Sequence, residues 1–216
     1  MKIRLIIFDL DGTLVNSSVD ITNALNYAIE PYGLEKLTVE NTISLVGEGI
    51  TRMIEKLLSG GEAALQPLVL KRFLDYYTEH LTDFTVPYPG VRETLELLGN
   101  YRKSVISNKR EDLSRRLLEN LGLSGYFDII WGSDSVQGKK PSPVPILEML
   151  KKVSCSAGEA VIVGDSNYDI EAGKSAGVRT VAVSYGYRDV SLLIDADVII
   201  DNMKDLLSVL DIFNAR

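Results

Sequence analysis

The stretch IIFDLDGTLVNSS, residues 6–18, places the carboxylates of Asp9 and Asp11 two positions apart, directly after an apolar run. The run is short, rich in β-branched residues and nearly continuous, which is typical of a strand buried on both faces of a parallel sheet. Gly12 and Thr13 follow at once. Because Asp and Gly are also favoured in Asx turns, the stretch alone leaves two interpretations open, a surface turn and a reaction centre.

Apolar runs of the same kind recur along the chain, and segments of helical period separate them. The further predicted strands are residues 103–107, 128–132, 160–164, 179–184 and, more weakly, 197–201. The predicted helices between them are residues 91–100, 113–122, 144–153 and 167–177, several of which end in glycine. This alternation predicts an α/β fold with a doubly wound parallel sheet.

One region breaks the alternation. Between the first strand and VPYPGV at 86–91, the apolar residues recur only at helical spacing, in ITNALNYAI (21–29), GITRMIEKLL (49–58) and LVLKRFLDYYTEHL (68–81). We therefore predict an inserted all-helical domain at residues 16–86, within an α/β core made of residues 1–15 and 87–216. A helical elaboration of the core domain itself is the alternative.

Composition narrows the classes of function. The chain has 216 residues, 45% of them hydrophobic and 25% charged, which is the balance of a globular protein with a sizeable core. Its formal net charge of −7 disfavours a general nucleic-acid surface, because such surfaces hold phosphates through clustered Lys and Arg. A small anionic molecule would need a local cationic pocket or a metal ion.

Cysteine usage and the N-terminus bear on location. Cys155 is the single cysteine, so no internal disulfide can form. The run MKIRLIIFD meets charge too early for a signal-peptide core and has no small-residue cleavage site. We expect a cytoplasmic protein with no membrane partner, and both a monomer and a homodimer stay open.

Polar residues gather where the predicted strands end, which is where ligands bind in open α/β sheets. Asp9 and Asp11 follow the first strand; Ser107 and Asn108 follow the second; GKKPSP (138–143) follows the third; Asp165 follows the fourth, with Asp169 close behind. Singly, each element could be a turn, a helix cap or a solvated loop. Their joint occurrence at one edge of the sheet favours a site.

These elements resemble the four motifs of the haloacid dehalogenase superfamily. The matching segments are FDLDGT (8–13), SN (107–108), KP (140–141) and GDSNYD (164–169), and the helical insertion is similar to that family's cap domain. Within the superfamily the chain resembles the phosphoglycolate phosphatases, through LVGEG (45–49) and PYPGV (87–91). The resemblance implies Mg²⁺-dependent hydrolysis of a small phosphomonoester, 2-phosphoglycolate, through an aspartyl-phosphate.

The residues at the strand ends suit that chemistry. Asp9 can attack phosphorus and divide one difficult step into two, but its approach to an anionic phosphate requires a divalent cation. Mg²⁺ usually takes one or two carboxylates together with substrate phosphate, a demand that Asp9 and Asp165 meet. By resemblance, Asp11 would offer its backbone carbonyl to the metal and Asp169 would hold a metal-bound water or a lysine. Which of Asp165 and Asp169 binds the metal directly stays open.

Asp11 lies two residues after the nucleophile, and side chains two apart on an extended strand point to the same side. Asp11 could therefore protonate the leaving oxygen and later accept a proton from water. Ser107 would hydrogen-bond a phosphoryl oxygen near the start of the following helix. Lys140, which directly precedes proline as in the resembled motif, would lie against Asp9 and the phosphate and offset negative charge, with Lys139 as the alternative. Gly12, Thr13 and Asn108, which belong to the same motifs, are further candidate substrate-binding residues.

The helical insertion would close over the site and select the leaving group. Gly47 and Gly49, on either side of Glu48, would permit close backbone approach to a substrate, although a simple helix-to-helix turn would look the same. Arg52 and Lys109 are candidates for binding a substrate carboxylate, with solvated surface charges as the alternative. The single histidine, His80, lies on a predicted helix and disfavours a histidine-based triad.

Several other functions are alternatives for a chain with these residues. A dehalogenase would share Asp9 but has little use for the acid at Asp11. A sugar-phosphate phosphatase or phosphomutase, a pyrophosphatase and a catalytically silent phosphoryl-binding protein would share most of the motifs. A receiver domain also uses a strand-end aspartate with Mg²⁺, but its acidic pair follows the first strand while its phosphoacceptor follows a later one, in a chain close to half this length.

Overall fold

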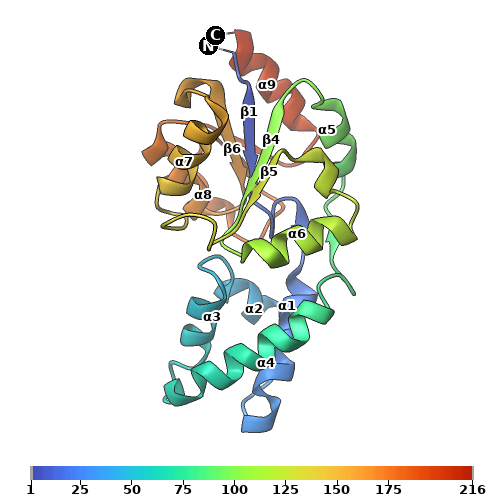
Figure 1. Ribbon diagram of the computed structural model, residues 1–216, viewed down its shortest axis with the longest axis vertical. Helices are drawn as coiled ribbons and strands as arrows, with labels where there is room; N and C mark the ends of the chain where they lie inside the picture. The colour runs from blue at the N-terminus through green and yellow to red at the C-terminus, as the bar shows by residue number, and fades with distance from the viewer. Residues whose placement is uncertain (1, 216) are drawn as a thin grey trace. The chain divides into compact units, whose positions relative to one another are not determined.

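Six parallel strands form the sheet that the apolar runs predict. The computed structural model describes residues 2–215. The strands, in chain order, are β1 (Leu5–Phe8), β4 (Arg102–Ile106), β5 (Ile129–Trp131), β6 (Ala160–Gly164), β7 (Arg179–Val183) and β8 (Val198–Ile200). They are arranged in the order β5-β4-β1-β6-β7-β8. Figure 1 labels β5, β4, β1 and β6 of this sheet. The predicted strands are thus confirmed.

Both faces of the sheet are covered by helices, as a doubly wound fold requires. The side chains of Ile6 and Phe8 belong to an apolar cluster with α5 (Val91–Leu97), α6 (Glu111–Asn120) and α9 (Asp205–Ala215). The alternate side chains of β1, Leu5 and Ile7, belong to a second cluster with α7 (Val144–Val153) and α8 (Asn167–Ala176). The alternation follows from the two-residue period of a strand and explains why the run is apolar throughout.

Strand β1 lies between strands that come from different parts of the chain. Phe8, its last residue, is in register with Val105 of β4 on one side and with Val163 of β6 on the other. The chain adds β4 and β5 on the first side of β1 and then β6, β7 and β8 on the second. The order therefore reverses at β1, and such a switch point is where open α/β sheets bind ligands.

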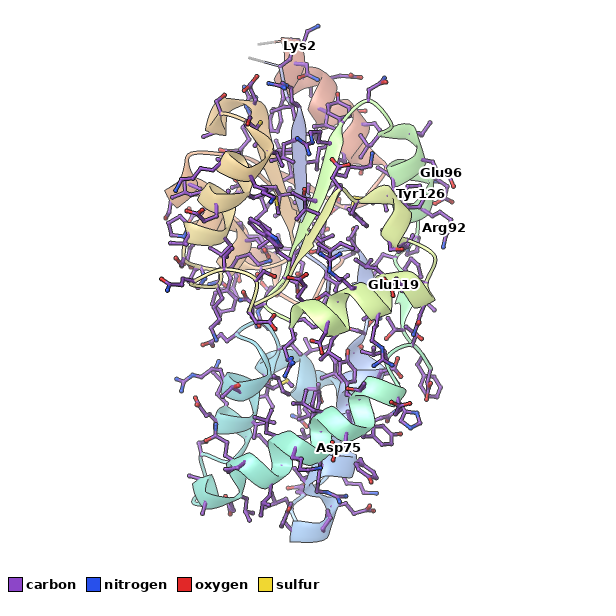
Figure 2. The ribbon with its side chains drawn as sticks, viewed as in Figure 1. Lys2, Asp75, Arg92, Glu96, Glu119 and Tyr126 are labelled. Carbon is purple, nitrogen blue, oxygen red and sulfur yellow. The ribbon has the colours of Figure 1, made fainter. Side chains whose placement is uncertain are left out.

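Polar contacts link helix α5 to the segment that follows helix α6. Arg92 of α5 donates a hydrogen bond of 2.6 Å to the carbonyl oxygen of Leu121, just beyond α6. The hydroxyl of Tyr126 donates to Glu96 of α5 over 3.0 Å, and both side chains are labelled in Figure 2. These contacts fix the C-terminal end of α6, whose N-terminal end follows the loop after β4.

The described chain divides into two compact units, Met1–Asn16 with Pro87–Arg216 and Ser17–Val86. The second unit contains α1 (Ser18–Ile29), α2 (Val39–Leu45), α3 (Ile50–Leu57) and α4 (Gln66–Glu79). The two connections between the units are β2 (Val15–Asn16) and β3 (Val86–Pro87), which pair as a short separate sheet. Among the described helices, none has both the length and the apolar character needed to cross a membrane.

The helical unit has its own core, in which α1 packs against α4. Asp20, on the first turn of α1, is 1% exposed. Its carboxylate accepts hydrogen bonds from the backbone nitrogen of Thr85 (2.8 Å), from the hydroxyl of Thr85 (2.6 Å) and from the backbone nitrogen of Phe84 (3.1 Å). One buried acid thus joins the beginning of this unit to its end.

Candidate active site

Asp9 is the first residue after β1. Its backbone nitrogen donates a 2.9 Å hydrogen bond to the carbonyl oxygen of Val163 in β6, which extends the pairing of the two strands by one residue. This contact holds the backbone at the switch point of the sheet. The carboxylate of Asp9 is therefore presented at the carboxyl end of β1, beside the loops that follow β4 and β6.

Lys140, from the loop after β5, lies against Asp9. Its ammonium nitrogen is 2.7 Å from Asp9 Oδ1, 2.7 Å from Asp169 Oδ1 and 2.7 Å from the carbonyl oxygen of Ile106. Burial alone would lower the pKa of Lys140, but the carboxylates of Asp169 and Asp9 raise it well above its usual value. The side chain thus remains a buried cation, with each of its three donors used.

Asn108 holds Lys140 in place. Its side-chain oxygen accepts a 3.0 Å hydrogen bond from the backbone nitrogen of Lys140, and its side-chain nitrogen donates 2.8 Å to the Lys140 carbonyl oxygen. Both residues are buried. The structure therefore gives Asn108, proposed from its motif as a substrate ligand, a clear role in fixing the loop that carries the lysine.

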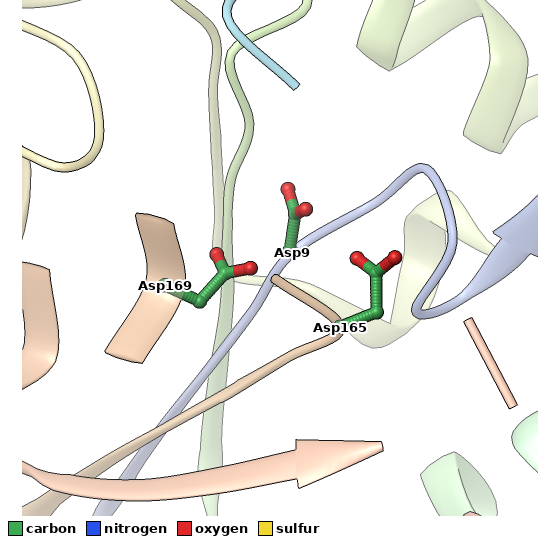
Figure 3. A group of neighbouring side chains, drawn as sticks. All are labelled: Asp9, Asp165 and Asp169. Carbon is green, nitrogen blue, oxygen red and sulfur yellow. The ribbon is translucent and has the colours of Figure 1, made fainter. Parts of the chain in front are cut away.

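Three carboxylates, those of Asp9, Asp165 and Asp169, meet at this edge (Figure 3). An oxygen from each lies within 4.8 Å of the others. Burial, with a further contribution from Asp169 and against the lowering effect of Lys140, raises the pKa of Asp9 to about 7. Burial, together with Asp9 and Asp169, raises the pKa of Asp165 to about 8. Lys140 alone does not balance the negative charge that these groups carry when ionised.

The two later aspartates differ in what they contact. Asp169, on the first turn of α8, has one oxygen on Lys140, while its other oxygen accepts hydrogen bonds from the backbone nitrogen (3.1 Å) and hydroxyl (2.6 Å) of Ser166. Asp165 accepts from the hydroxyl of Thr13 (3.2 Å) and from the backbone nitrogen of Tyr187 (2.7 Å). Thr13, a candidate substrate ligand, thus contacts Asp165 from the loop after β1.

Two glycines allow the backbone to approach Asp165. Gly12 has φ of +86°, and a Cβ atom there would lie 2.2 Å from Asp165 Oδ2. A Cβ atom at Gly186 would lie 2.2 Å from Asp165 Cβ and 2.6 Å from the carbonyl oxygen of Gly12. Side chains are therefore excluded at both positions. Sequence reasoning missed Gly186 and Tyr187; the available signal was a glycine within SYGY (184–187), just after the strand β7.

Asp11 and Lys109 form an ion pair beside this cluster. Lys109 Nζ is 3.0 Å from Asp11 Oδ1. The hydroxyl oxygen of Ser107, at the end of β4, accepts a 3.2 Å hydrogen bond from the backbone nitrogen of Lys109. Ser107 itself is 3% exposed, and its backbone nitrogen donates to the carbonyl oxygen of Trp131 over 3.0 Å. The structure therefore brings Ser107, Lys109 and Asp11 together.

The remaining candidates lie in the helical unit, at the start of α3. Gly47 has φ of +123° and Gly49, with φ of +83°, precedes the first residue of that helix. Arg52 is exposed and contacts Glu55 at 2.9 Å and Glu48 at 3.7 Å. Glu48 also pairs with Lys56. Positive φ at both glycines favours glycine there for conformational reasons.

Comparisons with known proteins agree with this architecture. A model of the haloacid dehalogenase-like hydrolase family matches residues 6–183. A phosphoglycolate phosphatase of Aquifex aeolicus is 39% identical over 210 residues, which cover 96% of this chain and 97% of that protein. A phosphoglycolate phosphatase of Chromobacterium violaceum is 37% identical over 215 residues, covering 96% of each chain.

Among solved structures, the crystal structure of a predicted phosphoglycolate phosphatase from Haemophilus somnus is similar throughout. Its TM-score is 0.90 at 30% sequence identity, covering 97% of this chain and 98% of that one. The chain belongs to the haloacid dehalogenase-like hydrolase family. The resemblance to this superfamily and, within it, to phosphoglycolate phosphatases is confirmed, as is the doubly wound α/β core.

Proposed function

We propose that this hydrolase is a Mg²⁺-dependent phosphatase that cleaves 2-phosphoglycolate through an aspartyl-phosphate on Asp9. The observation that carries the proposal is the placement of Asp9 at the switch point of the sheet, 2.7 Å from the buried cation of Lys140 and within reach of two further carboxylates. The phosphoglycolate part of the proposal is supported by the names of the relatives.

The acidic cluster fits a divalent cation. The carboxyl groups of Asp9 and Asp165, whose pKa values are raised to about 7 and about 8, are groups that bound positive charge would stabilise in their ionised forms. Asp169 has the cation of Lys140 on one oxygen, whereas Asp165 accepts hydrogen bonds from neutral donors, a hydroxyl and a backbone nitrogen. We therefore propose Asp165, together with the nucleophile Asp9, as the side-chain ligands of Mg²⁺. The backbone carbonyl of Asp11 completes the proposed protein ligands. The bound ion would neutralise phosphate charge and so permit the approach of an anionic nucleophile.

The protein's own groups divide the remaining tasks. A carboxylate oxygen of Asp9 forms a bond to phosphorus as the bond from phosphorus to the alkoxide oxygen breaks, and Asp11 gives its proton to that oxygen. In the second half, water attacks the phosphorus, Asp11 takes a proton from the water, and the bond between Asp9 and phosphorus breaks. Lys140 offsets negative charge near Asp9, and Ser107 is the proposed donor to a phosphoryl oxygen.

Recognition of a substrate carboxylate requires a cation. Of the two candidates, Arg52 is exposed on α3, where it contacts two glutamates of the helical unit. Lys109 instead contacts Asp11, the proposed proton donor. We propose Arg52, with the backbone at Gly47, Glu48 and Gly49, as the determinant of the leaving group, because the arginine closely follows two glycines, which leave the backbone just before α3 without side chains at those positions.

The test is phosphate release from a panel of phosphomonoesters and pyrophosphate, with Mg²⁺ or with EDTA. We expect turnover only with Mg²⁺, a preference for 2-phosphoglycolate, and loss of turnover in Asp9→Asn. Acid quenching during turnover of phosphorus-labelled substrate should leave label on the native protein, released by hydroxylamine as acyl phosphates are. Undiminished turnover by Asp9→Asn would refute the covalent route, and a preference for pyrophosphate or a sugar phosphate would replace the proposed substrate.

A further inference from the structure

The ion pair between Lys109 and Asp11 joins the loop after β4 to the turn after β1. The two side chains are 7% and 11% exposed, so the pair is nearly removed from water. A nearly buried ion pair constrains the geometry of both partners, because a displaced partner would leave an uncompensated charge behind. Arg110, the next cation in the chain, is instead exposed and pairs with Asp112 at the surface.

The backbone of Lys109 is held from both sides. Its nitrogen donates to Ser107 Oγ over 3.2 Å, and its carbonyl oxygen accepts from the nitrogen of Ser133 over 2.9 Å. Gly132 packs so closely that a Cβ atom there would lie 2.5 Å from the Lys109 carbonyl oxygen and 2.1 Å from the backbone nitrogen of Glu111. The loop after β5 thus clamps the loop after β4, and the lysine projects from a fixed base.

The side chain of Asp11 also projects from a constrained segment of backbone. It lies in the turn after β1, where the nitrogen of Gly12 donates to the carbonyl oxygen of Val15 over 2.9 Å and that of Leu14 donates to Leu10 over 2.9 Å. This turn fixes the position of the Asp11 Cα atom. The contact from Lys109 to Oδ1 constrains the rotation of the Asp11 carboxylate.

We propose that Lys109 is a positioning residue that orients the carboxyl group of Asp11 for proton transfer, rather than a ligand for a substrate carboxylate. The inference rests on the phosphatase function proposed above. With Oδ1 held by Lys109, the proton is exchanged at Oδ2: it passes to the leaving oxygen as the bond from phosphorus to that oxygen breaks, and it is replaced by a proton from the attacking water.

Three esters distinguish a positioning role of Lys109 from a role as a substrate-carboxylate ligand and from a purely structural role. Phenyl phosphate and 4-nitrophenyl phosphate are similar in size and carry no carboxylate, but phenolate is the poorer leaving group and depends more on a proton donor. 2-Phosphoglycolate has both an alkoxide leaving group and a carboxylate. The values of kcat/KM for these esters report events up to the departure of the leaving group. If proton donation is impaired, the loss of kcat/KM should therefore be larger for an ester whose leaving group depends more on the proton.

The variant is Lys109→Met, which keeps an unbranched apolar stem and removes the charge, and Arg110→Met is its matched control. We expect Lys109→Met to lower kcat/KM about 10- to 100-fold for phenyl phosphate and at least as much for 2-phosphoglycolate. The loss with 4-nitrophenyl phosphate should be about threefold or less, which also shows in the same sample that the protein is folded. Arg110→Met should retain native values for all three.

Other outcomes would overturn the inference. A loss confined to 2-phosphoglycolate would make Lys109 a substrate-carboxylate ligand, and an equal loss for all three esters would make its role structural. If the native protein cleaves the aryl esters but not 2-phosphoglycolate, the proposed substrate fails while the aryl pair still decides the role of Lys109. A native protein that cleaves none of the three would refute the phosphatase function and this inference with it.

Discussion

Replacing Lys140 by methionine removes a buried cation but keeps an unbranched side chain of similar length. The ammonium group contacts Asp9, Asp169 and the carbonyl oxygen of Ile106, each at 2.7 Å, and the side chain is 2% exposed. The variant leaves two carboxylates facing each other at a buried site without that cation. Both stability and catalysis should therefore respond.

The stability loss can be bounded. Breaking a buried ion pair by removing one partner costs about 3–5 kcal/mol. For a protein of this size, about 1 kcal/mol corresponds to roughly 2–4 °C in Tm, so the variant should melt roughly 6–20 °C below the native protein near neutral pH without metal. Protonation of a carboxyl group relieves the repulsion, so the difference should shrink as the pH falls.

The direction of that pH dependence follows from linkage. Lys140 lowers the pKa of Asp9, so its removal moves that pKa further above the value of 3.8 in an unfolded chain. The folded variant then holds protons that the unfolded chain has released, and its stability falls as pH rises through this range. Melting curves between about pH 5 and about pH 8 should show the gap between native and variant proteins widening with pH.

Activity gives the second measurement. Loss of one preorganised charge at a reacting phosphate costs about 10²- to 10³-fold in kcat, and 4-nitrophenyl phosphate with Mg²⁺ is a convenient substrate. Lys139→Met is the matched control, because Lys139 is the exposed neighbour in the same loop. The reasoning would be refuted by a Lys140→Met protein that melts within about 2 °C of the native one at every pH, or by a larger loss of activity in Lys139→Met.

Three further perturbations follow from the same contacts. Gly186→Ala places a Cβ atom 2.2 Å from Asp165 Cβ, so we expect at least about a tenfold weaker Mg²⁺ activation, measured as the Mg²⁺ concentration for half-maximal rate; unchanged activation would contradict this packing. In EDTA, the pKa values of about 7 for Asp9 and about 8 for Asp165 mean that the folded protein binds more protons than the unfolded chain above about pH 4, so its stability falls toward pH 8. The Tm gain from added Mg²⁺ should then grow with pH, and a constant gain would count against these carboxylates as ligands. Asp20→Ala leaves the buried donors of Thr85 without their acceptor and should lower the free energy of unfolding by about 1–3 kcal/mol in urea titrations, while a change below about 0.5 kcal/mol would show that water replaces the carboxylate.

Much of the core could be predicted because its signals are local. An apolar run with side chains buried on both faces marks β1, and the carboxyl ends of parallel strands must share an edge, so Asp9, Ser107 and Asp165 could be assigned to one site. Helices α2 and α9 were not singled out. Helix α2 begins with a capping box formed by Thr38 and Asn41. Helix α9 packs its apolar side chains into the same cluster as residues of the sheet.

The family resemblance indicated that Lys140 would lie against Asp9 and that Asp169 could hold a lysine, and the structure has both contacts. Local sequence alone does not distinguish the two lysines of that loop or show what Lys109 contacts. Lys139 and Lys140 are adjacent, and only the fold buries the second between Asp9 and Asp169 while leaving the first exposed. Lys109 was a candidate for a substrate carboxylate by position, whereas the structure places its ammonium group 3.0 Å from Asp11. A side chain's direction depends on the backbone of its loop, and here that loop is clamped by residues after another strand.

The sequence by itself determined the class of fold, the edge of the sheet at which the acidic residues gather and the family to which the chain belongs, because strand period, strand ends and short motifs are written in neighbouring residues. Only the tertiary structure decided which charges meet and which glycines, such as Gly186, must lack a side chain beside Asp165. Those contacts join residues that are distant in the chain, and ångström-scale packing and desolvation, rather than residue type, determine what they do.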